Sequence, residues 1–503
     1  VFLGIRTEFL FLSSRRANGV PTNCSTFWQK LVVGSLASGL FDINVTPLVI
    51  SRLSSNSSNV LNFATGFKPS VEVEFLGSTV SADSTFTEFK SGRLRNIKCY
   101  ALDDDCLCVI KSSYAHRTRK ELLVEELKVV NPTVSYHSRE TVSLFTKTPF
   151  SSCWLEETIR FIYTKPALNE LSKKAIAEFS RISRTSPLLM DEEHKNAWKK
   201  LNMVTFFLSP SKAPNVLNGD KINATRYILL SNTKAPLLEN SFPEDKKKAL
   251  ELSLRRNERC YSEHSTLLYP SKLWQDWTHV EDLLHMAEIW LLTLDKRGCA
   301  SILKSGATGL AQAFTLSLSA ASYHDSHLEV SLSLSDLHRE LAFGGLPIGV
   351  AVGDASARVR IAEDNTPFFE VSATATLYAC GGGCLGEPVT LGKSPTKIPI
   401  KITKPETSIL YIATSRKHLE QLRSTIHVSE VVSAPAHESE LLALHRHGAV
   451  MGGLPTWFWF FLVILLLAFH AFLAKLLWSE WQKGDMTPYN PYLRSRYSSN
   501  HSY

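Results

Sequence analysis

Near its C-terminus the chain reads Trp457-Phe-Trp-Phe-Phe-Leu-Val-Ile-Leu-Leu-Leu-Ala-Phe-His-Ala-Phe-Leu-Ala474, and this stretch decides how the whole protein is organised. No Asp, Glu, Lys or Arg occurs between residues 454 and 474. A helix rises about 1.5 Å per residue, so about 20 such residues cross a hydrocarbon core roughly 30 Å thick. We therefore predict a transmembrane helix over 454–477. A buried core helix is the alternative, but such helices seldom run this long without a charge.

The edges of the predicted span carry residues typical of a membrane interface. Trp457 and Trp459 lie at one edge, two further tryptophans follow the other edge, and Lys475 can extend its amine towards the headgroups. His470 is the polar group inside the span, where a histidine can carry protons or bind a metal. No second intramembrane polar group is present to receive a proton. We therefore interpret His470 as a neutral, packed side chain and the helix as an anchor.

Flanking charge predicts the orientation, because cytoplasmic flanks carry the excess of Lys and Arg. Lys475 lies at the end of the span and Lys483, Arg494 and Arg496 follow it, whereas only Arg446 precedes it closely. All nine cysteines precede the span, and disulfides form in the secretory pathway. We expect a secretory-pathway membrane, endoplasmic reticulum or Golgi, with the tail 478–503 cytoplasmic and the rest lumenal. Candidate N-glycosylation sites also precede the span, at Asn23, Asn44, Asn56 and Asn223.

The hydrophobic periodicity before the span changes from two residues to three or four, which predicts an α+β fold. Residues 1–160 contain short strand-like segments, such as the alternating 71–75 and Leu122–Val130 before the breaker Asn131-Pro132, and are expected to form an N-terminal β-sandwich. Residues 161–299 have helical spacing and are expected to form a reduced helical region. Its longest helix is predicted over 272–296, with Gly298 ending it.

Alternation returns after Cys299 and becomes clear from His327 onwards. We therefore expect a C-terminal β-sandwich over residues 300–430. Residues 431–453 then separate this domain from the membrane, and we expect them to form a stalk.

The chain has nine cysteines, which is an odd number, so at least one thiol has no disulfide partner within the chain. The aspartates at 103–105, together with Cys106, could hold a metal, but the paired Cys-x-x-Cys or His spacing typical of zinc is missing. We therefore interpret the aspartates as a solvated turn, and we predict no metal and no cofactor. The candidate disulfides are Cys99–Cys108 across a hairpin, Cys260–Cys299 around the long helix, and Cys380–Cys384 around three glycines.

Composition excludes one class of partner. The net charge of +7 is spread over 503 residues, and no basic stripe is interleaved with aromatic residues. Nucleic-acid binding is therefore not expected. Hydrophobic residues make up 44% and charged residues 20% of the chain, which is an ordinary globular mixture with enough apolar material for a full core.

Four stretches together resemble one known family. They are Trp290–Cys299, Tyr378–Pro388, Leu410–Thr414 and 458–473. The family is an uncharacterised group of single-pass type I membrane proteins with a KIAA-series name and a domain of unknown function. The resemblance covers residues 90 to 481. It implies a signal peptide, a lumenal region and a short cytoplasmic tail, and it implies no activity.

A more distant likeness concerns the lumenal region. Residues 114–132 are similar to the N-terminal β-sandwich of disaccharide phosphorylases and acid trehalases, and 188–198 resembles their first barrel helix. Residues 260–274 look like their loop that ends in a substrate-lining tryptophan. This likeness implies the order sandwich, helices, sandwich. It also makes His264, Trp274 and Trp277 the candidate sugar contacts, with packing as their alternative role.

The chain differs from those enzymes in the helical region that would carry the catalytic residues. Their helical region is a complete toroid, whereas 161–299 has room for only about four or five helices. The segment that should carry the general acid has no counterpart, and glycoside cleavage needs a pair of carboxylates across one pocket. Glu263 beside His264 is interpreted as structural. The sequence therefore predicts a non-catalytic lumenal scaffold that binds a protein partner or a glycan. The alternatives are a glycan-acting hydrolase and a trafficking receptor or subunit of a membrane complex.

Overall fold

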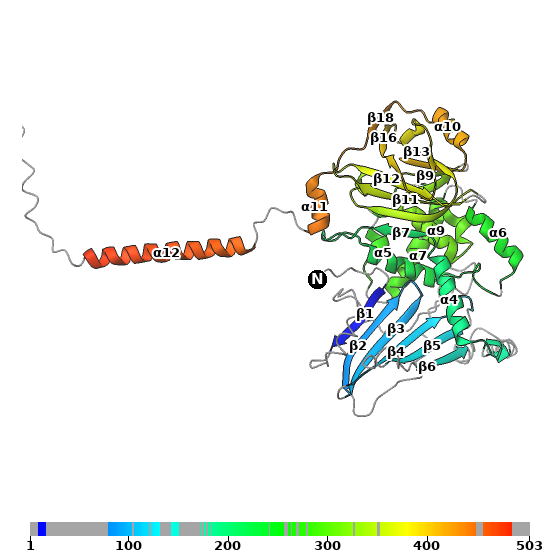
Figure 1. Ribbon diagram of the computed structural model, residues 1–503, viewed down its shortest axis with the longest axis horizontal. Coiled ribbons are helices and arrows are strands. Elements are labelled where there is room, and N and C mark those ends of the chain that lie inside the picture. Colours follow the sequence, from blue (N-terminus) through cyan, green and yellow to red (C-terminus); the bar gives the residue numbers. More distant parts are fainter. Residues whose placement is uncertain are drawn as a thin grey trace, which may run out of the picture.

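The fold, given by a computed structural model, places a layer of helices between two β-rich regions (Figure 1). This mixed helix and sheet architecture agrees with the α+β prediction. The structure describes residues 9–16, 79–102, 105–119, 122–130, 142–149, 173, 176–177, 180–182, 184–240, 242–255, 260–262, 264–267, 271–277, 280–324, 327–349, 353–448 and 456–484.

The N-terminal sheet has six strands, and each pairs antiparallel with the next along the chain. The predicted strand over Leu122–Val130 is present as β5. The hairpin around the aspartates is present too, with Cys99 directly opposite Cys108. The described residues form one layer here, so the facing sheet of a sandwich stays a prediction. The strands are β1 (Phe9–Arg16), β2 (Thr79–Glu88), β3 (Arg93–Leu102), β4 (Asp105–Ala115), β5 (Leu122–Val130) and β6 (Val142–Pro149).

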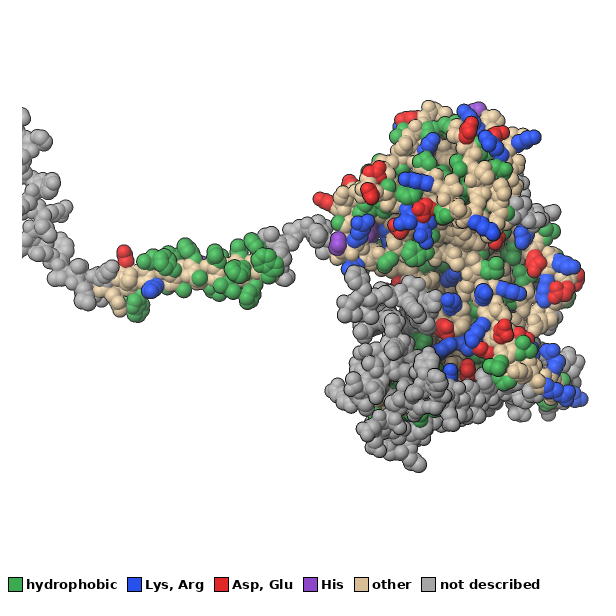
Figure 2. Space-filling model, in the orientation of Figure 1, with side chains coloured by type: hydrophobic (Ala, Val, Ile, Leu, Met, Phe, Trp, Pro, Cys, Tyr) green, Lys and Arg blue, Asp and Glu red, His purple; other side chains and the backbone are tan. Residues whose placement is uncertain are grey.

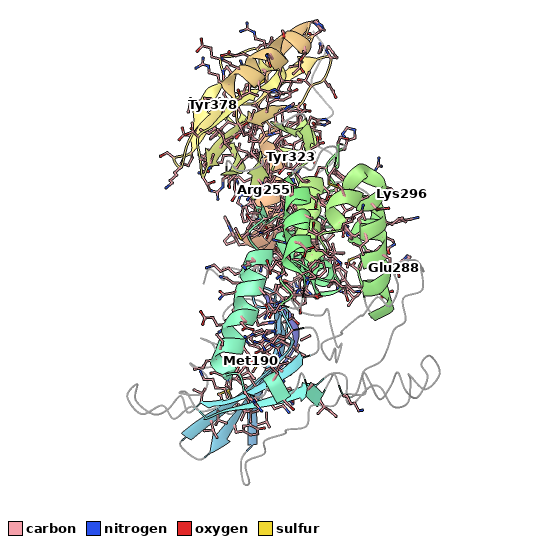
Figure 3. The ribbon with its side chains drawn as sticks, turned by 90° about the vertical axis from the view of Figure 1, so that its right-hand side faces the viewer. Met190, Arg255, Glu288, Lys296, Tyr323 and Tyr378 are labelled. Carbon is pink, nitrogen blue, oxygen red and sulfur yellow. A yellow bond between two sulfur atoms is a disulfide. The ribbon has the colours of Figure 1, made fainter. Side chains whose placement is uncertain are left out.

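The helical layer begins with α4, whose proline at the first position suits a helix start. Figure 3 shows Met190 of α4 against the N-terminal sheet, where it packs in one buried cluster with Tyr114, Val124 and Ile182. The layer contains α4 (Pro187–Leu201), β7 (Thr205–Leu208), α5 (Gly219–Ser231), α6 (Glu244–Arg255), η2 (Ser271–Trp274), α7 (Val280–Leu294), η3 (Asp295–Cys299), α8 (Ala300–Leu303) and α9 (Ala307–Leu318).

The predicted helix over 272–296 is divided in the structure. A short 3-10 turn over Ser271–Trp274 comes first, and the α-helix begins only at Val280. Leu273 and Trp277, which lie in and after the 3-10 turn, are both buried in the core. Gly298 has a φ of 83°, so the predicted end of the helix lies where glycine is needed.

Helices continue beyond Cys299, where strands were expected. Helix α9 is buried along nearly its whole length, including its Gln312, Thr315 and Ser317. Its start requires a glycine, because Gly306 has a φ of 68° and a Cβ there would clash with the carbonyl oxygen of Lys234. The helical region therefore extends to Leu318, past the boundary expected at residue 299.

Two five-stranded sheets and one two-stranded sheet follow. One has the order β15-β12-β11-β10-β7, so strand β7 of the helical layer forms its edge; the other has the order β14-β13-β17-β9-β8. Both five-stranded sheets share one hydrophobic core with the helices. Their strands are β8 (Ala321–His324), β9 (His327–Val330), β10 (Leu341–Ile348), β11 (Gly353–Ile361), β12 (Pro367–Ala373), β13 (Leu377–Gly381), β14 (Val389–Leu391), β15 (Thr396–Pro399) and β17 (Leu410–Ala413), and the small sheet pairs β16 (Lys401–Lys404) with β18 (Glu430–Ser433).

Three helices complete the described chain: α10 (Arg416–Thr425), α11 (Ser439–His447) and α12 (Thr456–Gly484). Helix α11 lies within the predicted stalk, but Leu442 and His445 are buried, so part of that segment packs on the folded region. Helix α12 is long and apolar enough over Trp457–Gln482 to cross a membrane. Figure 2 shows hydrophobic side chains covering its surface.

Candidate binding site

A pocket of about 260 Å³ lies where the N-terminal sheet, the helical layer and strand β7 meet. At about 30 Å³ per liquid water molecule, it has room for about nine waters. We call it the junction pocket. Its lining comprises Phe89 and Lys90 of the β2–β3 turn, Trp198 and Asn202 at the end of α4, Thr205–Leu208 of β7, and Gly219, Ile222, Asn223, Arg226, Tyr227 and Leu230 of α5.

Helix α5 contributes the largest share of this lining. Gly219, Ile222, Asn223 and Arg226 follow one another at spacings of three, one and three residues, so they share one helical face. The side chain of Asn218, which precedes the helix, makes no capping hydrogen bond to it. The first N–H groups of α5 therefore keep the partial positive charge of a helix N-terminus, at one end of the pocket.

Arg226 is the buried cation of the pocket, with only 9% of its surface exposed. Its Nη2 atom donates to the carbonyl oxygens of Leu201 (2.9 Å) and Val204 (2.5 Å). These hydrogen bonds cap the C-terminal end of α4. Its Nε has no hydrogen-bond partner. Burial lowers the pKa of Arg226 to about 10. The guanidinium therefore remains charged at neutral pH.

Aromatic rings form one wall of the pocket. Trp198 and Tyr227 stack with their centroids 5.4 Å apart, and Phe89 lies 5.0 Å from Tyr227. The guanidinium of Arg117 lies 5.7 Å from the Trp198 ring and donates from Nη2 to carbonyl oxygens at the end of α5. Gly92, at a φ of 61°, has no room for a Cβ beside the Trp198 indole. These contacts hold the wall rigid.

Amide side chains supply neutral hydrogen-bonding groups. Asn202 donates from Nδ2 to the carbonyl oxygen of Lys90 at 3.3 Å, which ties the β2–β3 turn to the end of α4. Asn223 is half-buried on α5. None of the described residues that line the junction pocket is Asp or Glu. Acid–base cleavage of a glycosidic bond needs carboxylates on both sides of the bond.

The predicted sugar contacts lie elsewhere. Trp274 donates from Nε1 to the carbonyl oxygen of Thr266 at 2.7 Å, and its ring meets Trp290 edge-on at 5.2 Å. Trp277 is 5% exposed and His264 is exposed. None of His264, Trp274 and Trp277 lines the junction pocket. Their placement favours the packing alternative for the two tryptophans. Glu263 lies outside the described residues.

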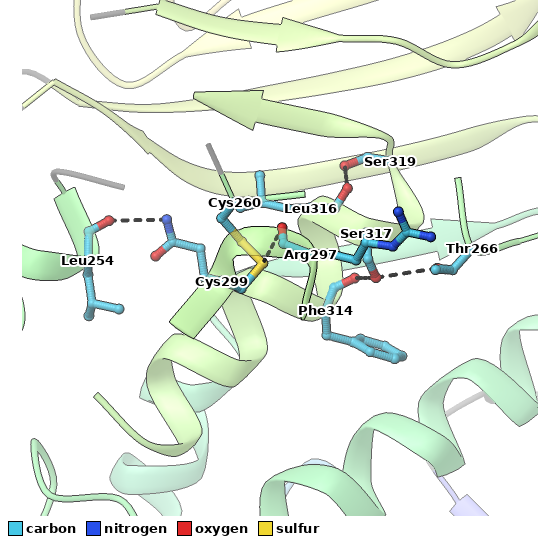
Figure 4. The surroundings of a disulfide bond; sticks show 10 residues. Leu254, Cys260, Thr266, Arg297, Cys299, Phe314, Leu316, Ser317 and Ser319 are labelled. Atoms are coloured by element: carbon cyan, nitrogen blue, oxygen red, sulfur yellow. Dashed lines mark hydrogen bonds between the residues drawn. A yellow bond between two sulfur atoms is a disulfide. The ribbon is translucent and has the colours of Figure 1, made fainter. Parts of the chain in front are cut away.

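The candidate cysteine pairs are joined in the structure: Cys99 with Cys108, Cys260 with Cys299, and Cys380 with Cys384. The middle pair, shown in Figure 4, ties the segment before η2 to the end of η3. The backbone N–H of the neighbouring Tyr261 donates to the Arg297 carbonyl at 2.9 Å. These bridges rigidify the fold and do not contribute to the pocket lining.

The other predicted site residues fall into two groups. The sequons at Asn23, Asn44 and Asn56 lie outside the described residues, whereas Asn223 lies in the junction pocket. Trp457, Trp459, His470 and Lys475 lie on α12, all with exposed side chains. His470 Nδ1 is 2.7 Å from the carbonyl oxygen of Leu466 in its own helix. Within the described part of the chain, no cluster of His, Cys, Asp and Glu could hold a metal ion.

A histidine cluster fastens α11 to the folded region. His445 of α11 stacks on His338 with centroids 4.6 Å apart, and Ser211 Oγ is 2.8 Å from His445 Nδ1. Ser211 Oγ also accepts the backbone N–H of Ala213 at 3.1 Å. Burial, followed by the nearby His445, lowers the pKa of His338 to about 4. Burial also lowers the pKa of His445, with a further contribution from Arg339.

We expect acid to release α11 from the folded region. The pKa values of His338 and His445 are lowered when α11 is packed on the folded region, so the neutral histidines stabilise the packed state. This stabilisation is complete above pH 6.5, the ordinary histidine pKa, and is lost as the pH falls towards about 4. The protection of the α11 amides against hydrogen exchange, relative to the intrinsic exchange rate at each pH, should therefore be lower at pH 5 than at pH 7.5, and His338→Phe should reduce that difference. His447→Gln, at an exposed position of the same helix, is the control. Equal effects of the two substitutions would contradict the role of His338.

Sequence reasoning found part of this site only indirectly. Trp198 belonged to a stretch that resembled a barrel helix, and Asn223 was noticed as a sequon. Arg226, Asn202 and Tyr227 carried no signal, because an isolated Arg, Asn or Tyr is common on any surface. Their proximity to Phe89 and Lys90 depends on the fold, which brings together residues more than 110 positions apart.

Comparison with known proteins places the chain in a family. It is 28% identical to the "Uncharacterized protein KIAA2013 homolog" of Xenopus tropicalis over 516 aligned positions, covering 88% of this chain and 81% of the relative. The Xenopus laevis homolog is 26% identical, with coverages of 88% and 82%. No solved structure matches. The family described as "Uncharacterized conserved protein (DUF2152)" matches residues 32–165 and 156–500, and the chain belongs to this family.

Proposed function

We propose that this protein is a non-catalytic, membrane-anchored binding protein whose folded region takes a glycan into the junction pocket. The observation that carries the proposal is a pocket lined by aromatic rings and side-chain amides, with no carboxylate among the lining residues that the structure describes. Pockets of this kind bind with their apolar walls and orient the ligand with a few polar groups. The same lining argues against a glycan-acting hydrolase, because it offers no acid and no base.

A single sugar ring suits this pocket in size and chemistry. Its C–H faces can lie against aromatic side chains, of which Phe207 is 47% exposed. Its hydroxyl edges both donate and accept hydrogen bonds, and so do the amides of Asn202 and Asn223. A pocket with the volume of about nine water molecules is too small for a longer oligosaccharide, so only one sugar residue of a glycan would enter it.

The cellular arrangement is part of the proposal. Helix α12 would anchor the protein, because its Trp457–Gln482 segment is long, apolar and unburied. Basic residues follow the span and the sequons at Asn23, Asn44 and Asn56 precede it, which supports a cytoplasmic tail over 478–503 and a lumenal folded region in the endoplasmic reticulum or Golgi. The buried cysteine pairs agree with an oxidising lumen.

Binding of monosaccharides to the full-length protein in lipid nanodiscs tests the function. We expect at least one sugar to bind saturably, and we expect Asn202→Leu to weaken it about tenfold, because a ligand hydroxyl loses its partner. Asn240→Leu, which changes an exposed amide outside the pocket, should have no effect. Saturable binding that is indifferent to Asn202→Leu, or release of monosaccharide from disaccharides, would refute the proposal.

A further inference from the structure

The junction pocket lies along the free edge of strand β7. All four residues of this strand, Thr205–Leu208, line the pocket, although successive side chains of a strand point to opposite faces of its sheet. Four consecutive residues therefore meet one pocket along the edge of the strand, where the main chain runs. Strand β7 is the last strand of its sheet, and β10 occupies its other side. Backbone groups of β7 thus border the pocket as well as side chains.

The register of β7 shows which backbone groups face the pocket. In an antiparallel pair, every second residue exchanges hydrogen bonds with the neighbouring strand, and the residues between turn their N–H and C=O groups to the other side. The N–H of Ser209 donates to the carbonyl oxygen of Glu340 at 2.8 Å, so Phe207, two positions earlier, also pairs with β10. Phe206 and Leu208 therefore present their N–H and C=O groups to the free edge.

The surroundings of these groups point to Phe206 as the accessible one. Val204 belongs to the same alternate set, and its carbonyl oxygen accepts from Nη2 of Arg226 at 2.5 Å, so the set faces α5. Leu208 is only 6% exposed, whereas Phe206 is half-buried. No residue that the structure describes forms a hydrogen bond with the N–H or C=O of Phe206. One donor and one acceptor therefore lie side by side at the pocket.

Two adjacent hydroxyls of a sugar ring match this pair of groups. One hydroxyl accepts from the N–H and its neighbour donates to the C=O, which uses the donor and acceptor capacity that every hydroxyl has. We propose that the backbone N–H and C=O of Phe206 hold the sugar in the junction pocket through two adjacent ring hydroxyls. The ligand class is therefore a sugar residue with two neighbouring unsubstituted hydroxyls, as at the free end of a glycan. This inference rests on the proposed function, because it names the contact that selects the ligand in that same pocket.

A peptide strand is the other ligand that pairs with a free strand edge. Strand β7 has only 4 residues, and Arg226 closes the edge at Val204. The pocket has the volume of only about nine water molecules. A sugar ring therefore suits this edge better than an extended chain.

Methyl glycosides and their 3-deoxy analogues test the inference. A methyl hexoside has free ring hydroxyls on C2, C3 and C4, so removal of the middle one leaves no two neighbouring hydroxyls on the ring. Binding of the methyl glycosides of glucose, galactose and mannose is measured with the full-length protein in phosphatidylcholine nanodiscs. We expect the 3-deoxy analogue of the sugar that binds to bind about tenfold more weakly, because one backbone group then lacks its partner. The 6-deoxy analogue keeps the neighbouring hydroxyls and should bind more tightly than the 3-deoxy analogue.

A proline variant tests the backbone donor itself. Phe206→Pro removes the N–H that faces the pocket and no hydrogen bond to β10, and proline is tolerated at such positions of an edge strand. It should reduce the preference for the parent sugar over its 3-deoxy analogue. Phe206→Leu keeps the N–H, so it should retain this preference even though it loses the aromatic ring. Thermal unfolding shows whether each variant is folded.

The outcomes separate the inference from the proposed function. Equal affinity for the parent sugar and its 3-deoxy analogue would overturn the contact with Phe206 and leave the binding function standing. An equal loss of preference in Phe206→Pro and Phe206→Leu would also overturn it, because the ring would then select the sugar. Failure of every tested sugar to bind would overturn both. A preference that falls only in the proline variant would support the inference, and the sugar comparison on the native protein decides if that variant fails to fold.

Discussion

Replacing Cys260 and Cys299 by alanine is expected to lower the free energy of unfolding by about 4 kcal/mol. The cysteines are 39 positions apart, and closing a loop of that length removes about this much chain entropy from the unfolded state. Both are fully buried beside the end of α7, so the substitutions also remove packed sulfur atoms. Thermal and denaturant unfolding of the full-length protein in detergent, followed by tryptophan fluorescence, measures the loss.

The Cys380–Cys384 pair provides a matched comparison. Its cysteines are only 4 positions apart, so the same reasoning predicts a loss of about 2 kcal/mol for its double alanine variant. Both pairs are buried, which makes the difference in packing small. If the two double variants lose equal stability, loop length does not explain the effect of the Cys260–Cys299 bridge.

The sequence predicted those parts of the fold in which one face of an element meets solvent. Helix α4 and strand β5 show a clear period because one side is polar. Helix α9 was missed for the opposite reason. It is buried on every side, and its Leu316-Ser-Leu-Ser319 end alternates like a strand. The break before Val280 was missed because Leu273 and Trp277 follow long-range packing.

The candidate site was harder to predict than the fold. The resemblance to an uncharacterised KIAA-series family was confirmed, but it carries no residue roles. The likeness to disaccharide phosphorylases directed attention to Trp274 and Trp277, which pack in the core. The junction pocket instead depends on Arg226, whose significance arises from burial and an unpaired Nε. No local pattern of residues reports either property.

Arg93 has the second large predicted effect: Arg93→Leu should lower the free energy of unfolding by about 3–5 kcal/mol, the range for breaking a buried ion pair. Arg93 is 2% exposed and pairs with Asp191 of α4, with Glu126 of β5 3.7 Å away. Its guanidinium also lies 4.4 Å from the centre of the Tyr114 ring. The substitution therefore leaves two carboxylates without their buried partner where the N-terminal sheet meets α4.

Arg95→Leu is the matched control for this prediction. Arg95 follows two positions later on β3 and pairs with Glu88 at 2.8 Å, but it is 31% exposed. An exposed pair contributes about 0–1 kcal/mol, so this variant should remain close to the native protein. Denaturant unfolding of both variants in the full-length chain makes the comparison. Equal losses would show that burial of Arg93 is not what makes its pairing important.

The pH dependence identifies the partner of Arg93. Burial raises the pKa of Asp191, but hydrogen bonds from Lys195 and Arg93 outweigh it, so the net pKa lies below the ordinary value of 3.8. A lowered carboxyl pKa stabilises the fold above that value, and this contribution is lost as pH falls through the folded-state pKa. The stability gap between the native protein and Arg93→Leu should therefore narrow below about pH 4. A gap that stays constant into acid would mean that Arg93 acts through packing on Tyr114 and not through Asp191.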